Sequence, residues 1–164
     1  MIQRIQTLYL LGIVFLGIGL CFVPVIQLVT PLDAVLQRMF EIGAFGMEEV
    51  TPNIDFIIVE PMSLQGLWGL TLTSVLIPVL AFVDIFLYRR RVLQARLNIF
   101  LAVLCLGYYG ILFMYIWFAK MNFGLDWHLT FWACIPLICF ILTLGAIRHI
   151  LKDEALVRAA DRIR

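Results

Sequence analysis

Charged residues are scarce in this sequence. They make up 14% of the 164 residues, against 63% apolar residues, whereas soluble domains carry about 25% charged residues. A soluble domain of this length has too small a core to bury so much apolar surface. The composition therefore excludes a soluble globular protein and predicts an integral membrane protein, with the lipid bilayer as its surroundings.

Motifs that carry known chemistry are also missing. The sequence has no G-x-S-x-G, H-E-x-x-H, phosphate-binding loop or glycine-rich dinucleotide signature. Its two histidines, His128 and His149, fall at opposite ends of one predicted helix, which excludes a shared metal ion. Paired carboxylates occur only as neighbours, at Glu48–Glu49 and Asp153–Glu154, where adjacent side chains point in different directions. We therefore expect a protein that is not an enzyme, with no catalytic residue, metal site or cofactor.

Cysteine pairs in polar loops are lacking as well. Cys21, Cys105, Cys134 and Cys139 all lie in apolar runs, and there is no C-x-x-C. Free cysteine in such surroundings behaves as a small apolar residue. This disfavours a four-helix membrane thiol oxidase, which needs cysteine pairs at or outside the membrane surface.

What the sequence does contain is four long apolar runs. About 20 apolar residues in a helix cross a hydrocarbon core of about 30 Å. We predict an all-α membrane protein, a four-helix transmembrane bundle of up-down-up-down topology that forms one domain over residues 1–164. Its spans are expected at residues 7–29, 64–88, 97–118 and 127–151.

Glycine and proline positions predict details of the first two spans. Gly12 and Gly19 are seven residues apart and share a helix face, which favours close approach of a neighbouring helix; glycines merely tolerated in a membrane helix are the alternative. Gly17 lies off that face. Pro78 has no N–H for the Ser74 carbonyl, so we expect a kink in the second span.

The segment between the first two spans, residues 30–62, has a different composition. Six carboxylates, three prolines and one basic residue predict a segment in water. Two β-prone runs, Met39–Phe45 and Ile54–Glu60, flank turn-forming residues at 48–53. We expect a short extracytoplasmic β-hairpin-like loop over the bundle, and a short amphipathic helix at Leu32–Phe40 is the alternative for its first half.

Basic residues are divided unequally between the two ends of the predicted bundle. Ten lie at the end with both termini and the turn at 89–96, and only Arg38 and Lys120 lie at the other. The positive-inside rule therefore predicts a multi-pass protein of the bacterial inner (cytoplasmic) membrane with both termini in the cytoplasm. The first run is too long for a signal-peptide core, so we expect it to be retained. The basic turn adjoins two spans, which favours contact with anionic lipid headgroups over nucleic acid.

The charged tail, residues 152–164, is predicted to extend the fourth span as a helix, because its apolar residues recur at i, i+3, i+4 and i+7. Its carboxylates either meet the basic turn and connect the two helical hairpins, or leave a solvated tail near anionic headgroups. The candidate structural and electrostatic residues of this end are Asp84, Arg89, Arg90, Arg91, Arg96, Arg148, Asp153, Glu154, Arg158 and Asp161.

Asp84 is the one acidic residue inside a predicted span, and an ionisable residue there is a functional hypothesis by default. Arg89 follows about 7.5 Å further along a helix axis. We expect Asp84 to form a structural ion pair with Arg96, Arg148 or the Arg89–Arg91 run. A proton- or ion-coupling role is the alternative.

The two ends and the middle of the chain resemble one family. The start MIQRIQTLYLL, the end KDEALVRAADRIR, and Phe86–Tyr88 followed by Arg91, Leu93–Gln94 and Arg96–Leu97 are similar to a domain-of-unknown-function family of four-helix membrane proteins from Bacteroidota. That family commonly has Lys-Asn where this chain has Arg89–Arg90. The resemblance implies a four-helix inner-membrane fold of unassigned activity and supplies no catalytic residues.

Three functions fit these features. The leading hypothesis is a non-enzymatic accessory or scaffolding subunit acting through protein and lipid contacts, because the outer loop and the basic helical tail are both suited to contact. Its partner would be another membrane protein or a second copy. A small transporter or channel subunit using Asp84 is the alternative, although its spans offer few polar residues, and a membrane enzyme is the third.

Overall fold

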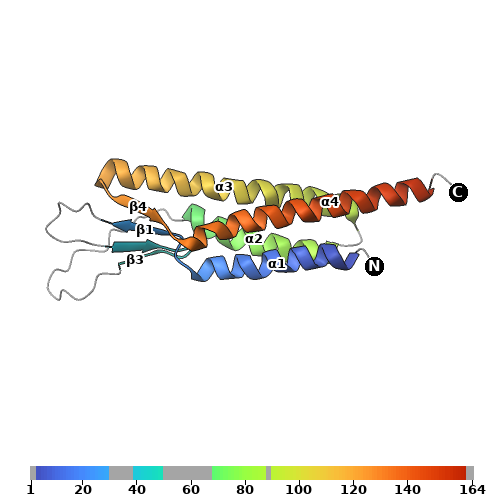
Figure 1. The fold of residues 1–164 in the computed structure, drawn as a ribbon, viewed down its shortest axis with the longest axis horizontal. Coiled ribbons are helices and arrows are strands. Elements are labelled where there is room, and N and C mark those ends of the chain that lie inside the picture. Colours follow the sequence, from blue (N-terminus) through green and yellow to red (C-terminus); the bar gives the residue numbers. More distant parts are fainter. Residues whose placement is uncertain (1–2, 30–38, 50–67, 88–89, 162–164) are drawn as a thin grey trace.

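The computed structural model describes residues 3–29, 39–49, 68–87 and 90–161. Four helices run along its long axis (Figure 1), with α1 and α3 each packing against both α2 and α4. The chain runs up, down, up and down through them, as predicted. The helices are α1 (Gln3–Phe22), α2 (Trp68–Phe86), α3 (Arg91–Phe123) and α4 (Ile135–Asp161).

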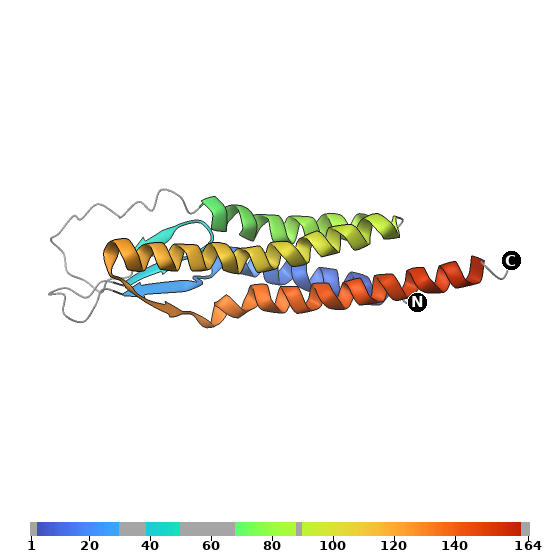
Figure 2. The ribbon, with the colours of Figure 1, turned by 90° about the horizontal axis from the view of Figure 1, so that it is seen from above.

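Three of the apolar segments are long enough to cross a membrane. They are Trp68–Phe86, Val92–Met121 and Phe131–Lys152, and Gln6–Phe22 forms a shorter apolar helix. The protein is therefore a multi-pass membrane protein. The start of α1, the connection between α2 and α3, and the end of α4 lie at one end of the bundle, here called the turn end (Figures 1 and 2).

A small antiparallel sheet occupies the opposite end, here called the sheet end. Its strand order is β3-β2-β1-β4, so the strand between α3 and α4 joins the three between α1 and α2. The outer part of α3 extends alongside this sheet (Figures 1 and 2). The strands are β1 (Ile26–Val29), β2 (Met39–Ile42), β3 (Met47–Glu49) and β4 (Asp126–Leu129).

The predicted β structure between the first two helices is confirmed, but its turn lies elsewhere. The Gly43 amide donates to the Gly46 carbonyl at 2.9 Å, which closes the β2–β3 turn ahead of the predicted position. Glu48 and Glu49, expected in the turn, belong to β3. The second predicted strand, Ile54–Glu60, lies outside the described residues, and so does all but the end of the alternative helix.

The helix ends also differ from the predicted spans. α1 stops at Phe22, because Pro24 has no N–H to continue the helix, and the last four residues of the predicted first span form β1. The fourth predicted span likewise begins with residues of β4. α3 runs beyond its predicted span at both ends and stops at Gly124, whose φ of 61° terminates the helix and whose amide donates to the Lys120 carbonyl at 3.1 Å.

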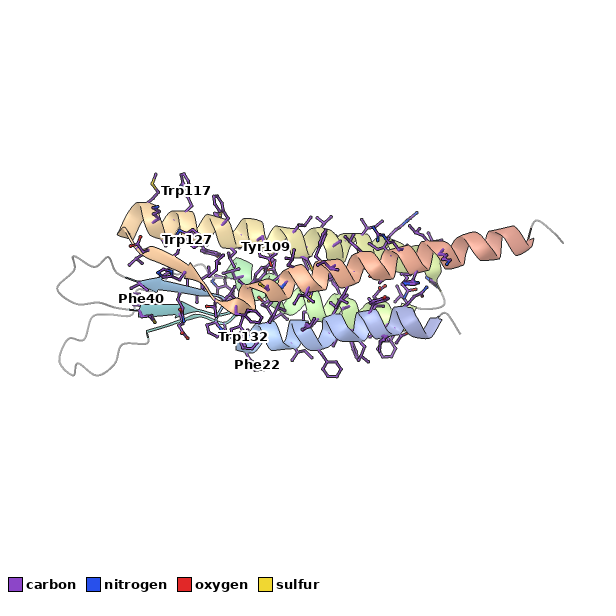
Figure 3. All side chains as sticks on the ribbon, in the orientation of Figure 1. Phe22, Phe40, Tyr109, Trp117, Trp127 and Trp132 are labelled. Carbon is purple, nitrogen blue, oxygen red and sulfur yellow. The ribbon has the colours of Figure 1, made fainter. Side chains whose placement is uncertain are left out.

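The core is continuous from the bundle into the sheet. Ile26 and Leu28 of β1 belong to the same buried cluster as Leu112 and Ile116 of α3. Large aromatic side chains stand around the sheet end, as expected where a membrane protein meets the headgroup region (Figure 3). Four of those labelled in Figure 3 are Phe22, Trp117, Trp127 and Trp132.

Candidate functional site: a buried polar cluster at the turn end

Asp84 lies in the last turn of α2 and is almost completely buried, with 1% of its surface exposed. Its carboxylate oxygen Oδ2 accepts a hydrogen bond from the amide nitrogen of Asn98, which is fully buried on α3. A carboxyl group and a carboxamide from different helices therefore meet inside the protein.

Gln94 completes this group by bonding to the backbone. Its side-chain amide donates to the Asp84 carbonyl at 3.4 Å, one of the last carbonyls of α2, which have no partner within their own helix. The Asn98 amide also donates to the Gln94 carbonyl at 3.1 Å. These three residues, here called the polar cluster, hold the end of α2 against the start of α3.

Two oxygen atoms of the polar cluster have no hydrogen-bond partner among the described residues. They are Oδ1 of Asp84 and Oδ1 of Asn98, and each exposes less than 1 Å². Buried polar atoms are nearly always paired, because an unpaired one costs about 1–3 kcal/mol. Such a pair of acceptors requires a donor.

The expected ion pair of Asp84 is not formed with any arginine whose side chain the structure describes. Arg90, Arg96 and Arg148 are all exposed, and Asp84 bonds to the neutral amide of Asn98 instead. The sequence could not reveal this partner choice, because it depends on how α2 and α3 are rotated against each other. Arg89 and the side chain of Arg91 lie outside the described residues.

The predicted tail helix is present, since α4 continues to Asp161. The side chains of this tail that were expected to meet the basic turn are not among those that the structure describes, so their pairing stays a prediction. They are those of Asp153, Glu154, Arg158 and Asp161.

Sequence reasoning missed Asn98 altogether and treated Gln94 only as part of the basic turn. A signal was available, because Asn98 is a carboxamide one residue inside the third predicted span, and such side chains often bond across membrane helices. Its spacing of four from Gln94 also places both residues on one face of α3.

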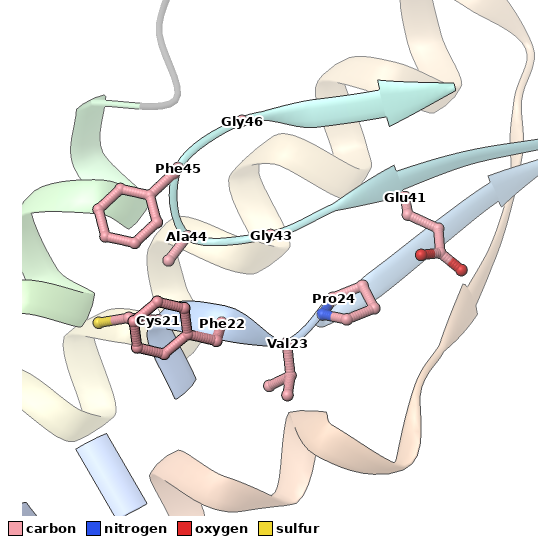
Figure 4. A pocket seen from close by; sticks show the side chains of 9 residues that line it. All are labelled: Cys21, Phe22, Val23, Pro24, Glu41, Gly43, Ala44, Phe45 and Gly46. Carbon is pink, nitrogen blue, oxygen red and sulfur yellow. The ribbon is translucent and has the colours of Figure 1, made fainter. Parts of the chain in front are cut away.

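A second candidate is an open pocket of about 470 Å³ at the sheet end (Figure 4). It forms where the end of α1 meets the β2–β3 turn, and the Thr71 hydroxyl of α2 holds that turn by donating to the Ala44 carbonyl at 2.6 Å. The one charged side chain in it, Glu41, accepts a hydrogen bond from Gln27 at 2.9 Å. Its lining residues are Cys21, Phe22, Val23, Pro24, Glu41, Gly43, Ala44, Phe45 and Gly46.

Among the described residues, no group of three or more histidine, cysteine, aspartate or glutamate side chains is placed to hold a metal ion. His128 is on β4, rather than on the fourth helix as predicted, and His149 stacks on Tyr9 of α1 with 5.6 Å between the ring centroids. The two histidines thus lie at opposite ends of the molecule. All four cysteines are free thiols.

The family model described as "Domain of unknown function (DUF4293)" matches residues 2–163, nearly the whole chain. No curated protein matches this chain.

Proposed function

Because this chain belongs to the DUF4293 family, a family of unknown function, we propose a function from the structure itself: a non-enzymatic accessory or scaffolding subunit of the bacterial inner membrane. In this proposal both termini are cytoplasmic and the sheet is extracytoplasmic. The protein acts through contacts with anionic lipid headgroups at the turn end and with a protein partner at the sheet end.

The observation that carries the proposal is the edge strand β4. All four of its residues are exposed, and β1 is its one partner among the described strands. A strand edge offers unpaired N–H and C=O groups to another chain. Such groups cannot face hydrocarbon, so β4 belongs in the headgroup region or against protein. This supports protein contact at the sheet end.

Lipid contact is supported by the turn end. Arg90, Arg96 and Arg148 are exposed there, next to the apolar surfaces of α2, α3 and α4. A basic side chain near an anionic membrane surface contributes about 1 kcal/mol to membrane attraction. The same bias of basic residues supports the cytoplasmic assignment of this end.

Site-specific photocrosslinking in native membranes tests the protein contact. A photoreactive side chain at His128, exposed on β4, is compared with one at Phe15, which is 68% exposed in the middle of α1. We expect a protein adduct of defined mass from position 128 and none from position 15. Co-expression of two differently tagged copies of this chain distinguishes an adduct with a second copy from an adduct with another protein. A reproducible lone monomer in mild detergent, with no adduct at position 128, would overturn the proposal.

A small transporter or channel subunit is the second candidate, because Asp84 is buried within a span. The geometry supports it less. The buried hydroxyls of Thr73 and Thr143 donate to carbonyls of their own helices at 2.7 Å. Ser74 is then the one fully buried serine or threonine in α2 and α4 whose hydroxyl has no partner among the described residues, and a single such group does not make a polar path to Asp84. Replacing Asp84 with Asn tests it: unchanged protein level and unchanged growth under ionic and pH stress would exclude coupling through this carboxyl.

A further inference from the structure

The two unpartnered oxygens of the polar cluster are the starting point. The Asn98 amide nitrogen already uses both of its hydrogens, one on Asp84 Oδ2 and one on the Gln94 carbonyl. It therefore has none left for Asp84 Oδ1. If the Asn98 carboxamide were flipped, its oxygen would face Asp84 Oδ2 and the Gln94 carbonyl, which are both acceptors. Within the described residues, neither Oδ1 atom has a donor.

One proton shared between the two Oδ1 atoms would satisfy both of them. A protonated carboxyl group and a carboxamide pair through two parallel hydrogen bonds: the amide N–H donates to one carboxyl oxygen, and the carboxyl O–H donates to the amide oxygen. The first of these bonds is present. We propose that Asp84 and Asn98 form a buried site for one proton, taken up from water, which Asp84 Oδ1 holds and shares with Asn98 Oδ1.

The charges around Asp84 support a neutral carboxyl group. The described part of α1 beyond Gln6 has no lysine or arginine, and the Arg96 side chain of α3 is exposed. On α4, Arg148 is exposed and His149 stacks on Tyr9. No described cation thus faces Asp84. Burial without a cation nearby strongly disfavours a charged carboxylate and disfavours a protonated carboxyl group far less.

The inference is independent of the proposed partner contact, which lies at the other end of the molecule. The proton site makes the contact between α2 and α3 sensitive to protonation, because separating the helices would expose Asp84 to water and release its proton. Helix packing and protonation at this end are thereby linked.

Infrared spectroscopy of the full chain in lipid nanodiscs near pH 7 tests the inference. Exposed carboxyl groups are ionised there, so the C=O stretch of a protonated carboxyl group reports on buried ones. We expect this band in the wild type and in Asp126→Asn, a control on the exposed β4, and its loss in Asp84→Asn. Absence of the band in the wild type, with carboxylate signals only, would overturn the proposal.

A second variant keeps the test valid if Asp84→Asn does not fold. In Asn98→Ala the carboxyl group loses its partner, so the band should shift in frequency or disappear. A band that is identical in wild type and Asn98→Ala would contradict the pairing. Crosslinking from position 128 on β4 should be the same whether or not the infrared band is present. The two measurements therefore distinguish failure of the proton site from failure of the partner proposal.

Discussion

At the scale of single residues, the polar cluster replaces a charge pair by a pair of neutral hydrogen-bonding groups. Asp84 was the residue that the sequence singled out, and it is indeed buried at a helix–helix contact. Its partner is a carboxamide rather than a guanidinium. A surface ion pair would be weakened by salt, whereas this buried hydrogen bond should not be.

Replacing Asn98 with Leu should lower the free energy of unfolding by about 1–3 kcal/mol, because it removes the interhelical hydrogen bond and leaves the Asp84 carboxyl group unpaired. Unfolding in mixed micelles measures it. Arg96→Gln is the matched control, since Arg96 is exposed on the same helix, and should change stability by less than about 0.5 kcal/mol. A larger loss for Arg96→Gln than for Asn98→Leu would restore the ion-pair hypothesis.

At the scale of helices, α1 and α2 meet where a glycine lies against a proline ring. A Cβ on Gly17 would come within 3.0 Å of the Pro78 Cβ and Cδ atoms, so only glycine fits there without a shift. The Cys21 thiol has one hydrogen and two acceptors within reach. They are the Gly17 carbonyl of its own helix at 3.4 Å and, at 3.6 Å, the Ser74 carbonyl that Pro78 leaves without its helical partner. α1 thus brings a weak, shared donor to the carbonyl that Pro78 leaves unpaired.

The prediction that a neighbouring helix approaches closely at the face shared by Gly12 and Gly19 was wrong. A Cβ on Gly12 would make an ordinary contact with Leu142 of α4, and one on Gly19 would meet nothing within 4 Å. Spacing along one helix identifies residues that share a face, but it does not say which of them the neighbouring backbone or a proline ring approaches.

Gly17→Ala should therefore destabilise the protein by about 1–3 kcal/mol through overpacking against Pro78, while Gly19→Ala should leave stability unchanged or raise it slightly. Thermal unfolding in detergent, followed by loss of helical circular dichroism, compares the two. Equal effects at both positions would show that α1 and α2 do not pack as described.

Tyr109 connects α3 to the start of α4. Its hydroxyl donates to the Ala133 carbonyl at 2.7 Å and accepts from the Leu137 amide at 3.1 Å. Leu137 is in the first turn of α4, where amides have no partner in their own helix. Tyr109→Phe leaves both groups unpaired and should cost about 1–2 kcal/mol, with faster hydrogen exchange at Leu137. Unchanged exchange there would show that the hydroxyl is not their partner.

The helices could be predicted far better than the sheet. Each helix is marked by a long local run of apolar residues, whereas β1 and β4 are four-residue strands at the edges of such runs. Ile26 pairs with Leu129 from a distant part of the sequence, and no local pattern reports that pairing. The same limit applies to the polar cluster: Asp84 is visible as a charge in a span, but its contact with Asn98 requires the packing of two helices.

At the scale of the whole molecule, the fold separates two ends of different chemistry. The turn end combines the start of α1, the end of α4, exposed arginines and the polar cluster. The sheet end combines an antiparallel sheet, exposed aromatic side chains and an open strand edge. The proposed function depends on these ends facing opposite sides of one membrane.

Thiol labelling of the native fold tests this arrangement most directly. Single cysteines are placed at Lys120 near the end of α3 and at Lys152 on α4, both exposed, in a Cys134→Ala background that removes the exposed native thiol. With a membrane-impermeant maleimide on spheroplasts, we expect Lys120→Cys to be labelled at once and Lys152→Cys only after permeabilisation. Labelling of both positions from the same side would contradict the account.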